Sequence, residues 1–309
     1  MRNRLKKIGC YLIIIVLLPY IVTVFMNGPT IPTDTTVDTT YVKVKKDDTE
    51  LELPLEEYCI GRMAKEIPAD YEEEALKAQA VIVRTSVYKS IKEGGTQVVL
   101  EDDFWTEEEM RQQWGSSYSG HYRKMQNAWN DTEGQVVMYG ENLANTPFTR
   151  LTNGNTRDGK EVLGSEDYPY LKIKDCPLDI EAAEQIQTVT VDDMDAEVTA
   201  MDTAGYVTSV RVGQETVNGE EFRQTYGLAS SCFILQKYDG KLRITTRGVG
   251  HGLGLSQYTA NEMAKEGKTC QRYCSIFLKA PRSKRWQKSL QIPGIQNNAP
   301  CFWQKYSQR

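Results

Sequence analysis

Residues 55–94, LEEYCIGRMAKEIPADYEEEALKAQAVIVRTSVYKSIKEG, decide the fold. Apolar residues recur at helical spacing before and after Pro68, which predicts two consecutive helices. Pro68 disfavours a helical conformation at Ile67, so the first helix must stop there, with Glu66 at its end. The second helix, residues 72–92, starts with acidic residues and is followed by two glycines, as helices commonly are.

The carboxylate of Glu66 lies beside the negative end of the first helix's dipole, which disfavours its charged form and raises its pKa. A carboxylic acid with a raised pKa suits general acid catalysis at neutral pH. The plainer interpretation is a solvated residue at a helix end, and position alone favours that interpretation. Lys65 is expected to point elsewhere around the helix.

A second carboxylate would be expected in an ordinary glycoside hydrolase. The other candidates stand in acidic clusters typical of solvated helix starts: Glu56, Glu57, Glu72, Glu73 and Glu74. One kind of sugar-polymer cleavage needs a single carboxylate, because the substrate's own hydroxyl attacks the anomeric carbon. The Glu then acts first as acid and afterwards as base.

Residues 247–254, RGVGHGLG, form a glycine-rich loop before a predicted helix at 255–265. The alternate glycines allow the backbone to approach a ligand or a neighbouring element closely. The loop lacks the spacing of phosphate-binding or dinucleotide-binding loops. His251 is either a binding residue or a hydrogen-bonded histidine in a tight turn. Ser256 and Gln257 begin the helix, where they can contact a polar ligand.

The composition of the 309 residues is that of a globular protein, with 40% hydrophobic and 26% charged residues. A formal net charge of −5 argues against a nucleic-acid partner, and two histidines exclude a His-rich metal site. Seven scattered cysteines indicate neither a disulfide framework nor a zinc ribbon. Cys59 could pair with His251 or His121 for nucleophilic catalysis, but its place on an apolar helix face predicts a core residue. His121 is expected at the surface.

The amino terminus carries basic residues followed by an apolar run at 8–26, close to the roughly 20 residues that span a bilayer. The basic flank should stay in the cytoplasm, so the chain that follows is expected outside the cell membrane. A cleaved signal peptide is the alternative, although no small-x-small cleavage site follows. We therefore expect residues 1–26 to form a single-pass anchor and the Pro/Thr/Asp-rich residues 27–40 to form a linker.

The rest of the chain mixes helical and alternating patterns, which predicts one exported α+β domain with a β-rich lobe at about 186–246. A capping box at Thr106-x-x-Glu109 begins a further helix. The polar loop 152–159 is of a kind that carries binding groups. Strands are expected at 41–46, 50–53, 135–139, 143–148, 186–191, 196–201, 206–212, 232–236 and 241–246, and additional helices at 122–129 and 220–226.

Two long segments resemble signatures of the stage II sporulation protein D family, which includes the amidase-enhancer proteins. LEEYCIGRMAKEIPADYEEEALKAQAVIVRT resembles the first signature and RGVGHGLGLSQYTANEMAKEGKT the last. FTRLTNGNT at 148–156 resembles a weakened middle signature, and VLGSEDYPYLKIKDCP follows it from Val162. The likeness covers roughly residues 41–269.

The resemblance implies a membrane-anchored lytic transglycosylase that cleaves peptide-free glycan strands of peptidoglycan while the forespore is engulfed. It implies a peptidoglycan amidase and other membrane-anchored engulfment proteins as partners. Glu66, the Glu before x-Pro, would be the catalytic acid and base. Other matching positions would line the cleft: Gln79, Arg84, Thr152, His251, Ser256 and Gln257. Two alternatives stay open, a non-catalytic wall-binding activator of an amidase and a structural engulfment scaffold.

The middle region departs from the family pattern in two ways. Some members carry a His/Cys zinc site there, whereas the residues between Cys59 and Cys176 offer no thiol and only the imidazole of His121. We therefore predict no metal and no cofactor. Thr149 and Asn153 stand where the middle signature has a His and a Gly.

The carboxyl-terminal segment also departs from the family pattern. Residues 270–309 lose helical periodicity and turn basic where the family continues with an amphipathic helix. A shifted reading frame and a divergent tail both explain this change. We expect a peptidoglycan-cleaving domain at 41–269 and a separate basic tail at 270–309.

Overall fold

The computed structural model describes residues 40–95 and 97–278. The expected anchor at 1–26, nearly all of the expected linker and residues 279–309 of the expected tail lie outside the described residues. Within the described ranges, no helix is long and apolar enough to cross a membrane. The fold is α+β, as predicted, and its buried apolar side chains gather in three clusters.

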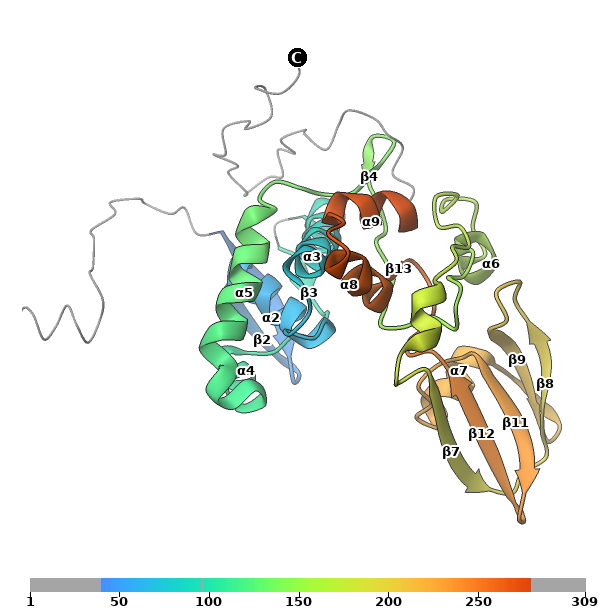
Figure 1. Ribbon diagram of the computed structural model, residues 1–309. Helices are drawn as coiled ribbons and strands as arrows, with labels where there is room; N and C mark the ends of the chain where they lie inside the picture. Colours follow the sequence, from blue (N-terminus) through green and yellow to red (C-terminus); the bar gives the residue numbers. More distant parts are fainter. Residues whose placement is uncertain (1–39, 96, 279–309) are drawn as a thin grey trace, which may run out of the picture. The chain divides into compact units, whose positions relative to one another are not determined.

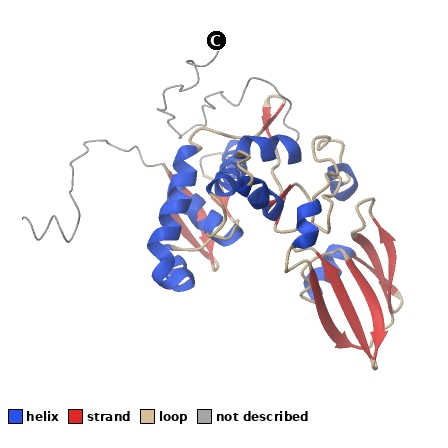
Figure 2. Ribbon diagram, viewed as in Figure 1, coloured by secondary structure: helices blue, strands red, loops and turns tan. Residues whose placement is uncertain are grey.

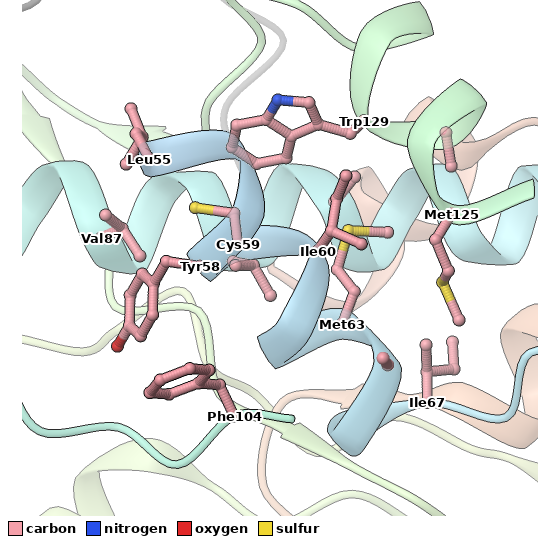
Figure 3. Close-up of a cluster of buried hydrophobic side chains, with 14 of the residues drawn as sticks. Leu55, Tyr58, Cys59, Ile60, Met63, Ile67, Val87, Phe104, Met125 and Trp129 are labelled. Atoms are coloured by element: carbon pink, nitrogen blue, oxygen red, sulfur yellow. The ribbon is translucent and has the colours of Figure 1, made fainter. Parts of the chain in front are cut away.

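Helix α3 (Glu73–Gly94) contributes side chains to two of these clusters. One face, which includes Val87, packs with α2 (Leu55–Glu66) and α5 (Tyr118–Asp131), as Figure 3 shows. The opposite face, which includes Val81, packs into the second cluster. Burial on two faces explains why the apolar residues of this helix do not form a single narrow stripe.

The chain before α5 also forms β1 (Tyr41–Lys46), β2 (Thr49–Pro54), β3 (Val99–Leu100) and α4 (Glu107–Trp114). The strand β1 lies between an antiparallel β2 and a parallel β3. The predicted capping box begins α4. The Thr106 hydroxyl accepts from the Glu109 amide at 3.2 Å, and the Glu109 carboxylate accepts from the Thr106 amide at 2.7 Å.

The next segment contains a short hairpin of β4 (Met138–Tyr139) and β5 (Asn142–Leu143). A strand was expected at 143–148, but β5 already ends at Leu143. Instead β6 (Phe148–Thr149) pairs in parallel with β13 (Leu255–Ser256), which is far away in the sequence. The carbonyl of Pro147 accepts from the Leu255 amide beside this pair. Two short helical turns complete the segment, namely α6 (Gly159–Leu163) and η2 (Pro177–Glu181), and a third, η1 (Gly115–Ser117), lies earlier, between α4 and α5.

A β-rich lobe forms where it was predicted, and Figures 1 and 2 show its strands together. One sheet has the order β10-β9-β8 and the other has the order β11-β12-β7, all antiparallel. Both sheets and α7 bury apolar side chains in the third cluster. The four-residue strand β10 was not expected. The elements are β7 (Ile186–Asp192), β8 (Ala196–Met201), β9 (Val207–Val212), β10 (Glu215–Asn218), α7 (Gly219–Thr225), β11 (Phe233–Tyr238) and β12 (Lys241–Arg247).

The last described helices, α8 (Gln257–Lys265) and α9 (Cys270–Phe277), contact each other and α3. The expected loss of periodicity after Thr269 does not hold for α9. Its buried side chains recur at three- and four-residue intervals: Cys270, Tyr273, Cys274 and Phe277. They belong to the second cluster, which also contains α3 side chains. The first part of the expected tail is therefore an amphipathic helix within the fold.

Candidate active site

Glu66 is the last residue of α2, as predicted. Ile67 is extended, with φ −132° and ψ 143°, because the following Pro68 disfavours a helical conformation. The backbone carbonyl of Glu66 is one of those that a helix end leaves without an intrahelical partner. The Nε2 atom of Gln257 donates a hydrogen bond to it at 3.0 Å. The first residue of α8 therefore caps the end of α2.

Three protein hydrogen bonds hold the Glu66 carboxylate. Its Oε1 atom accepts from Nε and Nη2 of Arg62 at 3.0 and 2.8 Å. Its Oε2 atom accepts from Nε2 of Gln79 at 2.7 Å. The Oε1 atom of Gln79 accepts from Gln257 at 3.1 Å, which turns the amide nitrogen of Gln79 toward Glu66. The Glu66 side chain is 13% exposed, so the carboxylate retains a narrow opening to solvent.

Burial raises the pKa of Glu66, and the nearby Arg62 guanidinium opposes that increase. The direction agrees with the expectation from the helix dipole, but desolvation is the main cause. Arg62 also donates from Nη1 to Asp102 Oδ2 at 2.8 Å. Asp102 lies near Glu66 because both carboxylates contact Arg62. The negative charge of Asp102 further favours the protonated form of Glu66. The Asp102 side chain is 48% exposed.

A buried carboxylate, Asp179 in η2, joins Thr152 to the start of α8. The amide and hydroxyl of Thr152 donate to Asp179 Oδ2 at 2.7 and 2.6 Å. The hydroxyls of Ser256 and Thr259 donate to the same carboxylate at 2.8 and 2.6 Å. Burial raises the pKa of Asp179, and these donors oppose the increase. Ser256 also caps α8 through the Thr259 amide, so Asp179 positions the helix start that carries Gln257.

The glycine-rich loop lies against the segment around β6. Gly252 and Gly254 have φ values of 76° and 79°, a region that other residues rarely adopt. A Cβ atom at Gly254 would lie 1.9 Å from the Pro147 carbonyl oxygen. The Thr149 hydroxyl donates to the Val249 carbonyl at 3.1 Å and accepts from the Gly252 amide at 3.2 Å. Thr149, which departs from the family pattern, thus joins β6 to the loop.

His251 lies near α7, whose residues Glu220 and Arg223 influence its pKa. Its Nδ1 atom accepts from the Leu253 amide at 3.1 Å, so the ring proton of the neutral histidine is on Nε2. Burial lowers the pKa of His251, with opposing contributions from Glu220 and Arg223. Its backbone carbonyl accepts from buried Arg157, which also pairs with Glu220 at 3.0 Å. The structure therefore places His251 in a second polar cluster, apart from the hydrogen bonds around Glu66.

Arg84 belongs to α3 and contacts the end of α5, and 2% of it is exposed. Its guanidinium donates to the Thr132 carbonyl at 2.7 Å, to the Thr132 hydroxyl at 3.0 Å and to the Trp129 carbonyl at 2.6 Å. The group also lies 3.8 Å from the centre of the Trp129 ring. These partners differ from those of Glu66, Gln79 and Gln257. The expected role of Arg84 in the cleft stays a prediction, whereas its contacts are those of a core residue.

The other candidates from the sequence have ordinary surroundings. Cys59 is buried in the first cluster, as predicted, and burial raises the pKa of its thiol to about 12. A thiol of that pKa is a poor nucleophile. The ring of His121 is half-buried and lies 5.4 Å from that of Trp114. Lys65 pairs with Asp103 rather than with Glu66, as expected.

Sequence reasoning missed two residues of this site, Arg62 and Asp179. Arg62 precedes Glu66 by four residues, the spacing at which helical side chains meet, so that contact had a readable signal. Asp179 lies in a short 3-10 turn, and its four donors come from distant segments, so nothing local pointed to it. In the part of the chain that the structure describes, no group of three or more His, Cys, Asp and Glu side chains could hold a metal ion.

The helices that carry Glu66 and Gln79 fall within residues 45–139, which match the family model described as stage II sporulation protein. Over 242 residues, the chain is 33% identical to stage II sporulation protein D of Bacillus subtilis (strain 168) and 31% identical to that of Bacillus amyloliquefaciens. Both alignments cover 70% of this chain and 70% of the relative. An uncharacterized protein of Brachyspira hyodysenteriae is 26% identical over 239 residues, which cover 70% of this chain and 63% of that protein. Because identity above 30% extends over more than two thirds of both chains, this protein belongs to the stage II sporulation protein D family.

Proposed function

We propose that this protein is a lytic transglycosylase that cleaves peptide-free glycan strands of peptidoglycan during sporulation. The main support is the Glu66 carboxylate, which is largely buried and has a raised pKa. Both of its oxygens are held by side-chain donors, Arg62 and Gln79. A rigidly held carboxylic acid with a raised pKa is suited to general acid catalysis. The names of the two Bacillus relatives support the sporulation context.

The proposed reaction uses Glu66 twice. The protonated carboxyl gives its proton to the glycosidic oxygen as the bond between that oxygen and the anomeric carbon breaks. The C6 hydroxyl of the same sugar then bonds to the anomeric carbon and passes its proton to Glu66. The step regenerates the acid, consumes no water and leaves a 1,6-anhydro end.

The two carboxylate oxygens of Glu66 are not equivalent in this mechanism. The Oε1 atom accepts two hydrogen bonds from Arg62, whereas Oε2 accepts one from Gln79. A carboxylate oxygen has two lone pairs, so Oε2 has an acceptor position left for the proton. We assign the proton transfers to Oε2. Asp102 has no reacting role here, and its charge balances that of Arg62.

We further propose that the reaction takes place outside the cell membrane, with residues 1–26 as the anchor and 27–40 as the tether. Glycan strands are polymers that lie outside that membrane, so an enzyme that cleaves them needs this orientation. A peptidoglycan amidase that removes the peptides first would supply the substrate. This amidase and other anchored engulfment proteins are the proposed partners.

The products of the full-length protein on purified peptide-free glycan strands test the proposal. We expect mass spectrometry to find new 1,6-anhydro ends, in amounts that increase with time. Reducing ends formed by addition of water would indicate a hydrolase instead. Undiminished binding to the glycan without new ends would favour a non-catalytic activator of an amidase.

Arg62→Met should move the alkaline limb of the pH–rate profile to higher pH. Glu66 must be protonated to act as an acid, so cleavage is lost as the pH rises through its pKa. The Arg62 charge lowers that pKa, so its removal should move the limb to higher pH. Lys65→Met, which removes a positive charge from the same helix, serves as the control. A limb that stays in place would show that Arg62 does not set the pKa of Glu66.

A further inference from the structure

A cavity of about 570 Å³ lies away from the contacts of Glu66, at the carboxyl-terminal end of α3. Its walls come from the last turns of α3, from the β4–β5 hairpin and from residues 166–170. Aromatic side chains form one part of the lining, namely Tyr139, Tyr168 and Tyr170. Amide and amino groups, including those of Asn142, Asn145 and Lys92, form another part. None of these residues takes part in the proposed reaction.

The aromatic wall is rigid because Tyr170 is fixed at its centre. The Tyr170 hydroxyl accepts from the backbone amide of Asn145 at 2.8 Å and donates to the backbone carbonyl of the same residue at 3.2 Å. The Tyr139 ring packs on it with a centroid distance of 4.7 Å and an interplanar angle of 36°. The Tyr168 ring meets it edge-on at 6.4 Å. Tyr170 is buried, but Tyr139 is 39% exposed and Tyr168 half-buried, so both of these rings are accessible from solvent.

The charges around the cavity disfavour a polyanion as its ligand. Lys89 pairs with Glu93 at 3.9 Å, and its amine also contacts Asn145. Carboxylates of Glu93, Glu166 and Asp167 stand beside the two lysines of the lining. A bound phosphate chain would meet these carboxylates and be repelled. The lining suits a neutral ligand that has hydroxyl and amide groups.

We propose that this cavity is a second binding site for the glycan strand, remote from the cleaved bond. The rings of Tyr139 and Tyr168 would pack on the C–H faces of pyranose rings, which are apolar, because aromatic rings gain most from such burial. The Asn142 amide and the Lys92 amine would bond to sugar hydroxyl and acetamido groups. The proposal rests on the proposed function for the identity of the polymer.

The position of the cavity on α3 fits a polymer substrate. Lys89 follows Gln79 by ten residues on this helix, which corresponds to about 15 Å along its axis. A strand of several sugars is long enough to contact both places. A site that holds the strand away from the cleaved bond keeps the enzyme on the polymer between cleavages. Its contribution should therefore increase with the length of the glycan.

Binding by the full-length protein tests the proposal in a Glu66→Gln background, in which the glycan should stay intact. We expect Tyr139→Ala to weaken binding to purified peptide-free glycan strands at least about tenfold in a sedimentation assay. Tyr238→Ala, which removes a 56% exposed tyrosine of the β-rich lobe, should leave the affinity unchanged. Lys92→Met removes an exposed amine at the cavity and should weaken binding severalfold.

Unchanged affinity in both Tyr139→Ala and Lys92→Met, with an unchanged melting temperature, would overturn the proposal. If Tyr139→Ala alone lowers the melting temperature, the affinity of the Lys92→Met protein decides whether the proposal stands. Cleavage of short glycans by protein with an intact Glu66 should not change with either substitution. The two proposals fail separately. A protein that makes no anhydro ends can still lose affinity through Tyr139→Ala, and a protein that makes them can keep its affinity in Tyr139→Ala.

Discussion

Glu66→Gln should lower the rate of glycan cleavage by about 10²–10⁴-fold, the range that a general acid commonly contributes. An amide of the same shape cannot give a proton to the glycosidic oxygen or accept one from the attacking hydroxyl. The amide oxygen can still accept from Arg62, and that cation keeps Asp102 as a partner at 2.8 Å. The fold should therefore survive the change. Quantifying anhydro ends by mass spectrometry measures the loss.

Glu57→Gln is the matched control, because Glu57 lies on the same helix and is half-buried. It makes the same chemical change and should leave the rate unchanged. Full activity in Glu66→Gln would show that another group supplies the proton. Asp102, the other carboxylate that contacts Arg62, would then be the next residue to test.

Arg84→Met should lower the free energy of unfolding by about 2–4 kcal/mol, since hydrogen bonds to a charged group contribute about 1.5–3 kcal/mol each. The Trp129 and Thr132 carbonyls lie at the end of α5, where helix carbonyls have no intrahelical partner. Met fills the space of the side chain but donates nothing, so these oxygens lose the charged donor and keep only the Thr132 hydroxyl and the Gln135 amide. The contact with the Trp129 ring is lost as well. Denaturant unfolding of the full-length protein measures the change.

Arg123→Met supplies the comparison for Arg84, because Arg123 is exposed on α5. A surface substitution of this kind should stay within about 0.5 kcal/mol of the parent. Folded Arg84→Met protein should cleave glycan at nearly the parent rate. If it instead keeps its stability and loses affinity for glycan, Arg84 contacts substrate in solution, as the family resemblance implies.

Much of the fold could be predicted from local patterns. Pro68 fixed the end of α2, the capping box marked the start of α4, and alternating residues located the main strands of the β-rich lobe. The pairing of β6 with β13 could not be predicted, because two-residue strands carry no periodicity. The helix α9 was missed because the basic residues after it obscured the spacing of its four buried side chains.

The candidate active site, like the fold, could be predicted only in part. Glu66, Gln79 and Gln257 were expected to share a cleft from the resemblance, and the structure joins them by hydrogen bonds. Arg84 was expected in the same cleft because it matches a position of the same signature, and that role stays a prediction. Sequence does not distinguish an arginine that faces a substrate from one that caps a neighbouring helix, since only the packing of α5 decides which it does.

The hydrogen bond from Gln257 to the Glu66 carbonyl joins residues that are 191 positions apart. Contacts of such sequence separation form late in folding, because a long loop must close before they are made. A chain that emerges amino terminus first therefore carries its Glu66 for most of its synthesis without the residue that holds its backbone in place. The proposed acid reaches its final geometry only after nearly the whole described chain has emerged, so a product that ends before Gln257 would lack this bond to the Glu66 backbone.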